Sequence, residues 1–184
     1  MSRARRSKPT YEADADNCEP LPQATAATAT SPGGSSKSSA RSWAIALIID
    51  AGPLYAYVDG DDAHHGACLE LLETHPGPLI VPTLVITEVV YLIASRLGWQ
   101  AETRFLGDLA GGEMSLEPVD PADTLRIAEL VARYHDLPLG TVDASVIAAA
   151  ERLGATEVAT LDRRHFTVIR PRHVEAFNLL PGRV

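Results

Sequence analysis

Short apolar runs alternate with longer segments of helical pattern along residues 43–184, and this alternation restricts the folds open to the chain. Five short runs have the composition of strands: residues 44–49, 79–81, 114–119, 158–161 and 167–169. Four segments between them have the pattern of helices: residues 83–97, 100–109, 120–135 and 142–153. The pattern predicts a three-layer α/β fold, in which a central, mainly parallel sheet of about five strands has helices on both faces.

Single residues predict several helix boundaries. Asp120, followed by Pro121 and Asp123, is typical of a helix start, because the acid caps free backbone N–H groups and proline suits the first turn. Gly98 and Gly154 follow helical segments and predict their ends, since glycine readily adopts the left-handed conformation found there.

Residues 1–42 differ in composition from the rest of the chain. They are rich in alanine, threonine, serine, proline and glycine, with almost no large apolar side chains. Such a segment cannot bury enough surface to offset the loss of chain entropy, so we expect a disordered tail at 1–42 and one domain at 43–184. The early basic residues could contact nucleic acid or simply be solvated: Arg3, Arg5, Arg6 and Lys8. We expect no secretory signal, because the tail lacks an apolar core segment.

The overall composition is ordinary for a globular domain, with 46% hydrophobic and 22% charged residues in 184. No apolar run approaches the roughly 18–20 residues of a membrane span, so no membrane partner is expected. Cys18 and Cys68 form no motif, which favours a reducing, cytoplasmic setting. The net charge of −8 argues against a broad basic surface for nucleic acid. An acidic chain can still act on a polyanion when its acids surround a divalent cation.

Four acidic side chains are expected at one edge of the predicted sheet. Asp50 directly follows the first strand, and Asp162 directly follows the strand at 158–161. Glu88 and Asp143 lie near the starts of helices, which face the same carboxyl edge in this architecture. Four acids that are far apart in sequence are therefore expected to meet at one place.

The surroundings of two of these acids point to a metal ion. Glu88 interrupts an apolar stretch, and Asp143 begins a helix of largely apolar residues. A carboxylate in such surroundings is costly unless it is paired or metal-bound. Mg²⁺ prefers oxygen ligands and would relieve the repulsion between clustered carboxylates. Because the same ion can activate water and orient a phosphate, the pattern indicates phosphodiester hydrolysis.

Each acid also has a simpler interpretation. Asp50 could cap the end of a strand, and either Asp143 or Thr141 could cap a helix. Glu88 could pair with an arginine from elsewhere in the chain, and Asp162 could be a turn residue. Each signal is weak alone, and the specific feature is their joint placement.

Three stretches carry the four acids: ALIIDAGPLYAYVD, VPTLVITEVVYLIASRLG and LGTVDASVIAAAERLGATEVATLDRRHF. In this order they resemble the PIN-domain family, and within it the VapC-type toxins of bacterial toxin–antitoxin systems. The resemblance covers about residues 45–171 and includes an Asp-x-x-x-Phe form at Asp162 and Phe166. The sequence departs from the pattern at Ala51 and Gly52, where many relatives carry serine or threonine.

The resemblance implies a PIN-like fold and a Mg²⁺-dependent endoribonuclease, with Mn²⁺ as a possible substitute. Such a toxin would cut structured RNA, for example tRNA or rRNA, and would bind a VapB-like antitoxin. The resemblance implies that Asp50 and Asp143 bind the metal directly. Glu88 and Asp162 would complete the catalytic site, and Thr160 would support it through a hydroxyl hydrogen bond. Together with the apolar helix at 83–97, the resemblance also suggests a homodimer.

Positive charge gathers near the end of the chain. Residues 44–151 carry 4 basic and 17 acidic residues, whereas residues 152–184 carry 6 arginines and 3 acids. Arg163 and Arg164 follow Asp162 directly, so they are candidates for binding RNA phosphates. An equally open alternative is that these arginines bind an antitoxin tail or a partner subunit.

The histidines allow several interpretations. His165, close to Asp162, could assist proton transfer, contact a phosphate or be a structural surface residue. His64 and His65 could bind a metal, although exposed positions at a helix start are the simpler explanation.

Other functional classes fit less well. A phosphatase of the haloacid dehalogenase type needs a second aspartate two residues after the first, where this chain has Gly52. A receiver domain needs a lysine near its end, and residues 43–184 contain none. The chain also has no glycine-rich phosphate-binding loop. A non-toxin RNA-processing nuclease and a degenerate PIN-like binding module without catalysis stay open as alternatives.

Overall fold

The computed structural model describes residues 45–137 and 139–182. The tail expected at 1–42 lies outside these residues, as does the start of the expected domain at 43–44. The elements follow in chain order: β1 (Leu47–Ile49), α1 (Ala51–Val58), α2 (His65–Thr74), β2 (Leu79–Pro82), α3 (Thr83–Arg96), α4 (Trp99–Ala110), β3 (Ser115–Glu117), α5 (Pro121–Arg133), α6 (Thr141–Leu153), β4 (Glu157–Ala159), α7 (Arg163–Val168) and β5 (Asn178–Leu180).

The five strands form one parallel sheet in the order β3-β2-β1-β4-β5. β1 lies in the centre and is buried at every position, as is its neighbour β2. This burial explains why both strands are apolar throughout, since each packs against helices on two faces. The expected parallel sheet of about five strands is confirmed.

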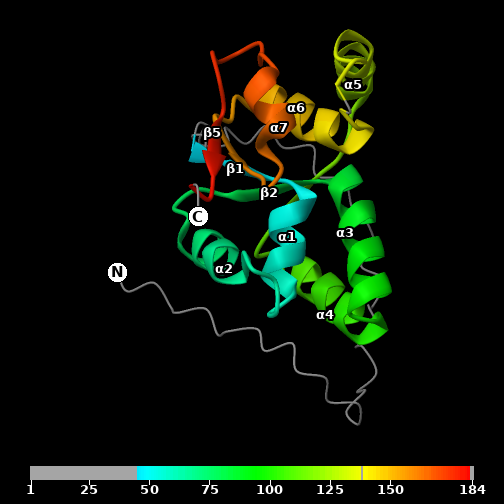
Figure 1. Ribbon diagram of the computed structural model, residues 1–184, viewed down its shortest axis with the longest axis vertical. Coiled ribbons are helices and arrows are strands. Elements are labelled where there is room, and N and C mark those ends of the chain that lie inside the picture. Colours follow the sequence, from blue (N-terminus) through cyan, green and yellow to red (C-terminus); the bar gives the residue numbers. More distant parts are fainter. Residues whose placement is uncertain (1–44, 138, 183–184) are drawn as a thin grey trace, which may run out of the picture.

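Helices cover both faces of the sheet. In Figure 1, α1, α2 and α4 lie on one side of the central strands, and α6 and α7 lie on the other. α3 packs against α1 and α4 and also contacts α6. Within the described part of the chain, no helix is long and apolar enough to cross a membrane. The three-layer α/β architecture expected from the sequence is therefore confirmed.

The helix boundaries predicted from single residues are confirmed at three places. Asp120 caps α5 by accepting the N–H of Asp123 at 2.8 Å, and the Asp123 carboxylate accepts the N–H of Asp120 in return. Gly98 and Gly154 follow α3 and α6 with φ of 88° and 67°. Both glycines adopt positive φ, which other residues rarely do.

The fifth strand is not where the sequence predicted it. Residues 167–169 were expected to form a strand, but α7 continues to Val168 and the fifth strand is β5. Asp162 starts this helix by accepting the N–H of Arg164, and Phe166 and Ile169 fill the core, each 1% exposed. Capping and burial thus override the preference of β-branched residues for strands. β5 is a partly exposed edge strand of three residues, Asn-Leu-Leu, which is too short to show a strand pattern.

Candidate active site

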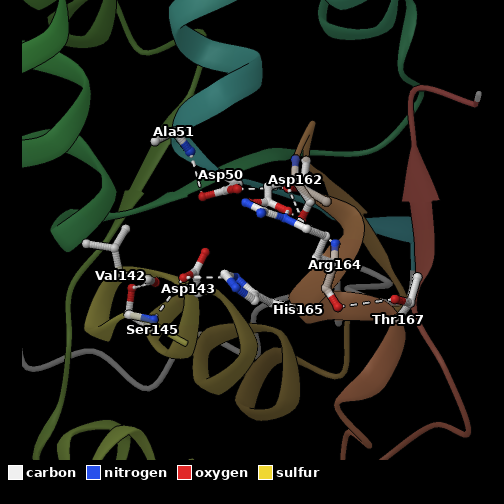
Figure 2. Close-up of polar contacts among 11 residues, drawn as sticks. Asp50, Ala51, Val142, Asp143, Ser145, Asp162, Arg164, His165 and Thr167 are labelled. Atoms are coloured by element: carbon white, nitrogen blue, oxygen red, sulfur yellow. Dashed lines mark hydrogen bonds and ion pairs between the residues drawn. The ribbon is translucent and has the colours of Figure 1, made fainter. Parts of the chain in front are cut away.

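A cavity of about 870 Å³ opens at the carboxyl edge of the sheet. All four predicted acids line it: Asp50, Glu88, Asp143 and Asp162. They come from the end of β1, from α3, from the first turn of α6 and from the start of α7. Figure 2 shows Asp50, Asp143 and Asp162 around the same space, with His165 beside Asp143.

Asp50 is the most deeply buried of the four, with 6% of its surface exposed. It caps α1 by accepting the N–H of Ala51 at 2.7 Å, and its other oxygen accepts the Thr160 hydroxyl at 2.8 Å. The pKa of Asp50 is raised to about 6, chiefly by burial and in smaller part by the nearby charges of Asp143 and Glu88, against the effect of these two hydrogen bonds. The simpler alternative was a cap at the end of a strand, whereas Asp50 caps the start of α1 and also lines the cavity.

Glu88 lines the cavity from α3 and lies beside the face of that helix that packs into the core. The buried residues of that helix, Val85, Val89 and Ile93, recur every fourth position, and Glu88 falls outside this stripe. Partial burial and the charge of Asp143 raise the pKa of Glu88. No ion pair between Glu88 and an arginine forms among the described residues. The alternative in which Glu88 serves as half of an ion pair therefore lacks support.

Asp143 occupies the first turn of α6 without being the residue that caps it. Gly140 is the N-cap, Thr141 is the first helical residue, and the Asp143 carboxylate accepts the N–H of Gly140 at 3.0 Å. The same carboxylate oxygen lies 3.4 Å from Nδ1 of His165. His165 is 7% exposed, so the alternative of a surface position is wrong.

Asp162 differs from the other acids because a cation neutralises it. Nε and Nη2 of Arg164 donate to its two carboxylate oxygens at 2.9 and 2.5 Å. These hydrogen bonds lower the pKa of Asp162 to about 2. β4 ends at Ala159, so Asp162 follows the strand after two intervening residues rather than directly.

Thr160 connects two of the acids. It is fully buried, its hydroxyl donates to Asp50, and its oxygen accepts the backbone N–H of Asp162 at 3.1 Å. This geometry agrees with the supporting hydroxyl expected at Thr160. It also supplies a hydroxyl to Asp50 in a chain that has Ala51 and Gly52 immediately after the acid.

Replacing Thr160 with valine tests this connection. Because the Thr160 hydroxyl favours the ionised form of Asp50, its loss should raise the pKa of Asp50 above about 6. Carboxyl-carbon NMR titration of the metal-free protein would measure the change. Thr103→Val removes an exposed hydroxyl on α4 and is the matched control. An Asp50 titration identical in Thr160→Val and wild type would show that the hydroxyl does not act on this carboxylate.

The arginines near the site already donate hydrogen bonds to groups of the protein. Nη2 of Arg163 donates to the backbone carbonyl oxygens of Leu179 and Pro181, which ties the start of α7 to β5. Arg172 donates to the Glu129 carboxylate and does not line the cavity. Arg164, whose side chain is 80% exposed, is the arginine at the cavity that is most free to exchange its partner.

The donor groups fit a hard divalent cation in their chemistry. Asp50, Glu88 and Asp143 are carboxylates around one cavity, and no arginine forms an ion pair with any of them among the described residues. Among the described residues, no three acidic, histidine or cysteine side chains are close enough to hold a metal as they stand. His64 and His65 therefore belong to no such group in the described part of the chain. Side-chain adjustment on binding would therefore be required.

Residues 47–170 match the PIN domain family model. Ribonuclease VapC26 of Mycobacterium tuberculosis is 36% identical over 135 residues, which cover 73% of this chain and all of that protein. The chain therefore belongs to the PIN-domain family, and within it to the VapC-type proteins.

Solved structures share the fold at lower identity. VapC20 of Mycobacterium tuberculosis, described as a toxin that cleaves the sarcin-ricin loop, aligns with a TM-score of 0.63 and 19% identity, covering 70% of this chain and 98% of that one. VapBC2 of Rickettsia felis, bound to a DNA fragment from its promoter, aligns with a TM-score of 0.55 and 14% identity. The alignment covers 74% of this chain and 99% of that one. The PIN-like fold implied by the resemblance is confirmed.

Proposed function

We propose that the chain is a divalent-metal-dependent endoribonuclease that acts as the toxin of a toxin–antitoxin module. The observation that carries this proposal is the set of carboxylates that line one cavity: Asp50, Glu88 and Asp143. The ribonuclease name of the 36% identical relative supports RNA as the substrate. Structured RNA such as tRNA or rRNA is the substrate class, in agreement with a cytoplasmic location.

Asp50 and Asp143 are the residues that would hold Mg²⁺, or Mn²⁺ in its place. The bound cation supplies Lewis-acid stabilisation of a phosphate and lowers the pKa of a bound water. Ala51 and Thr160 hold Asp50 in one orientation, which pre-organises an oxygen for the cation. Gly140 restrains Asp143 in the same way.

Glu88 and Asp162 complete the site in different ways. Glu88 has a raised pKa and lies at the exposed side of the cavity, so its carboxylate is suited to accept the proton of an attacking water. Asp162 holds the Arg164 guanidinium at the cavity wall. That guanidinium is positioned to exchange Asp162 for an RNA phosphate, since it forms paired hydrogen bonds with either group. Arg163 is the weaker candidate for binding RNA, because two backbone carbonyl oxygens already accept from it.

Replacing Arg164 with glutamine should weaken RNA binding more than it slows the chemical step. Loss of one phosphate contact is expected to lower the slope of log affinity against log salt by about 1. Fluorescence anisotropy of labelled RNA across a salt series, using the Asp50→Asn variant to prevent cleavage, measures this slope. Arg133→Gln is the control, since Arg133 stacks on Tyr134 and is not at the cavity. A slope unchanged by Arg164→Gln would remove this residue from the RNA-binding surface.

A VapB-like antitoxin and a second copy of the chain are the proposed protein partners. The structural relatives include VapBC complexes from Rickettsia felis and Salmonella typhimurium, which supports the antitoxin. Large apolar side chains are exposed on the α3–α4 pair: Tyr91, Trp99 and Leu106. Exposed apolar groups on neighbouring helices support a homodimer.

The test of the proposed function is cleavage of structured RNA with Mg²⁺ and with EDTA. We expect cleavage with Mg²⁺ or Mn²⁺ and none with EDTA. A folded protein that cuts no RNA with either metal would favour the degenerate binding module. Expression should also be toxic, and co-expression of a small neighbouring gene should relieve the toxicity. Cleavage without toxicity would favour a non-toxin RNA-processing nuclease.

A further inference from the structure

His165 is a buried polar side chain without a hydrogen bond. It lies in α7, it lines the cavity, and both ring nitrogens are buried and unpartnered among the described residues. Buried polar atoms in folded proteins nearly always have a partner, so each exception calls for an explanation, and a functional contact is one of them. Oδ2 of Asp143 lies 3.4 Å from Nδ1 of His165, which is within the distance of an ion pair. Figure 2 shows the ring directed at that carboxylate.

The segment that carries His165 is firmly held. The Thr160 hydroxyl bonds to Asp50, Arg163 bonds to the carbonyl oxygen of Leu179, and Phe166 is buried in the core. One short segment from β4 to α7 therefore contacts both proposed metal ligands, Asp50 through Thr160 and Asp143 through His165. Such a segment can fix the relative orientation of the two carboxylates.

We propose that His165 is a positioning residue, whose Nδ1–H orients the Asp143 carboxylate for the divalent cation. This inference rests on the proposed function. Oδ2 of Asp143 already accepts the N–H of Gly140, and a small approach of the His165 ring from 3.4 Å would let the same oxygen accept its Nδ1–H, which leaves Oδ1 for the cation. A neutral ring with its proton on Nδ1 is sufficient, so no change of protonation is required. Because both ring nitrogens are buried, direct contact with RNA is the less direct explanation.

Two amide substitutions test the roles of the two ring nitrogens one at a time. Asparagine at position 165 places an N–H donor near the position of Nδ1, whereas glutamine places it near that of Nε2. We expect His165→Gln and His165→Ala to weaken Mn²⁺ binding and RNA cleavage by about 10- to 100-fold, the range for residues that orient metal ligands. His165→Asn should stay within a few-fold of wild type. Calorimetric titration of Mn²⁺ into each metal-free protein gives the affinity independently of activity.

The controls distinguish a failure of the proposed role of His165 from a failure of the proposed metal site. His173→Gln is the matched control, because His173 also has a buried, unpartnered Nδ1 but does not line the cavity. If wild type binds no Mn²⁺, the proposed function fails. If wild type binds Mn²⁺ and the glutamine and asparagine variants bind it equally well, only the role of His165 fails. Loss of cleavage with unchanged Mn²⁺ affinity would also overturn it. Should His165→Ala unfold, the comparison of asparagine with glutamine still decides.

Discussion

The Asp50→Asn variant is expected to cleave RNA about 10³-fold more slowly than the wild type. Its metal-free form is expected to be more stable than the metal-free wild type at pH 7. The loss follows because a Lewis-acid contribution of several kcal/mol depends on a charged ligand. The gain follows because the pKa of Asp50 is about 6 in the folded chain, against an ordinary value of 3.8. The folded state therefore binds the proton more tightly than the unfolded state, and stability falls as pH rises from about 4 to about 6.

The expected gain for Asp50→Asn at pH 7 is about 2 kcal/mol, from about 1.4 kcal/mol for each unit of pKa and a discount for the altered hydrogen bonds. The amide fits the site, since its oxygen can accept the N–H of Ala51 and its nitrogen can donate to Thr160. Urea unfolding in EDTA at pH 5 and pH 7, together with single-turnover cleavage, measures both effects. Asp136→Asn removes an exposed carboxylate and should change neither. A destabilised Asp50→Asn variant would contradict the account of an uncompensated charge.

Arg126→Met is expected to lower the free energy of unfolding by about 3–5 kcal/mol, a large part of the 5–15 kcal/mol typical of a domain. Arg126 of α5 is 8% exposed, and its Nε and Nη2 donate to the two carboxylate oxygens of Glu151 in α6 at 2.8 and 2.9 Å. The Glu151 side chain is also only 8% exposed. Removing the guanidinium would leave this carboxylate buried without its main partner, which is costly.

The double variant Arg126→Met with Glu151→Leu separates the ion pair from the loss of packing. It should recover most of the stability, because removing both charges avoids the uncompensated carboxylate. Arg133→Met, which removes only a contact over the Tyr134 ring, should cost about 1 kcal/mol or less. Urea unfolding measures all variants. A loss below about 1 kcal/mol for Arg126→Met, or no recovery in the double variant, would contradict the role of this pair in joining α5 to α6.

The fold was predictable where local chemistry and burial agree. The apolar strand before Asp50 and the capping residues at Asp120 both act within a few residues, so the sequence predicts them directly. The fifth strand was not predictable from its composition. Residues 167–169 resemble a strand, whereas α7 extends through Val168, with its cap at Asp162 and with Phe166 buried in the core.

The acidic residues of the candidate site could be predicted from the sequence, but the charged groups that contact them could not. The rule that ligands lie at the carboxyl edge brings Asp50 and Asp143 to one cavity, as the structure has them. The pairing of Asp162 with Arg164 depends on the geometry of one helical turn. The approach of His165 to Asp143 depends on where the fold places α7 relative to the first turn of α6. Neither contact leaves a pattern in sequence spacing.

The most direct measurement of the central claim is the effect of Mn²⁺ on the free energy of unfolding at pH 7. If Asp50 and Asp143 hold the cation, Mn²⁺ at about 100 times its dissociation constant should stabilise the wild type by about 2.7 kcal/mol. The same concentration should leave Asp50→Asn and Asp143→Asn nearly unchanged. Equal stabilisation of all three proteins, or none in the wild type, would contradict a metal-dependent site at these carboxylates.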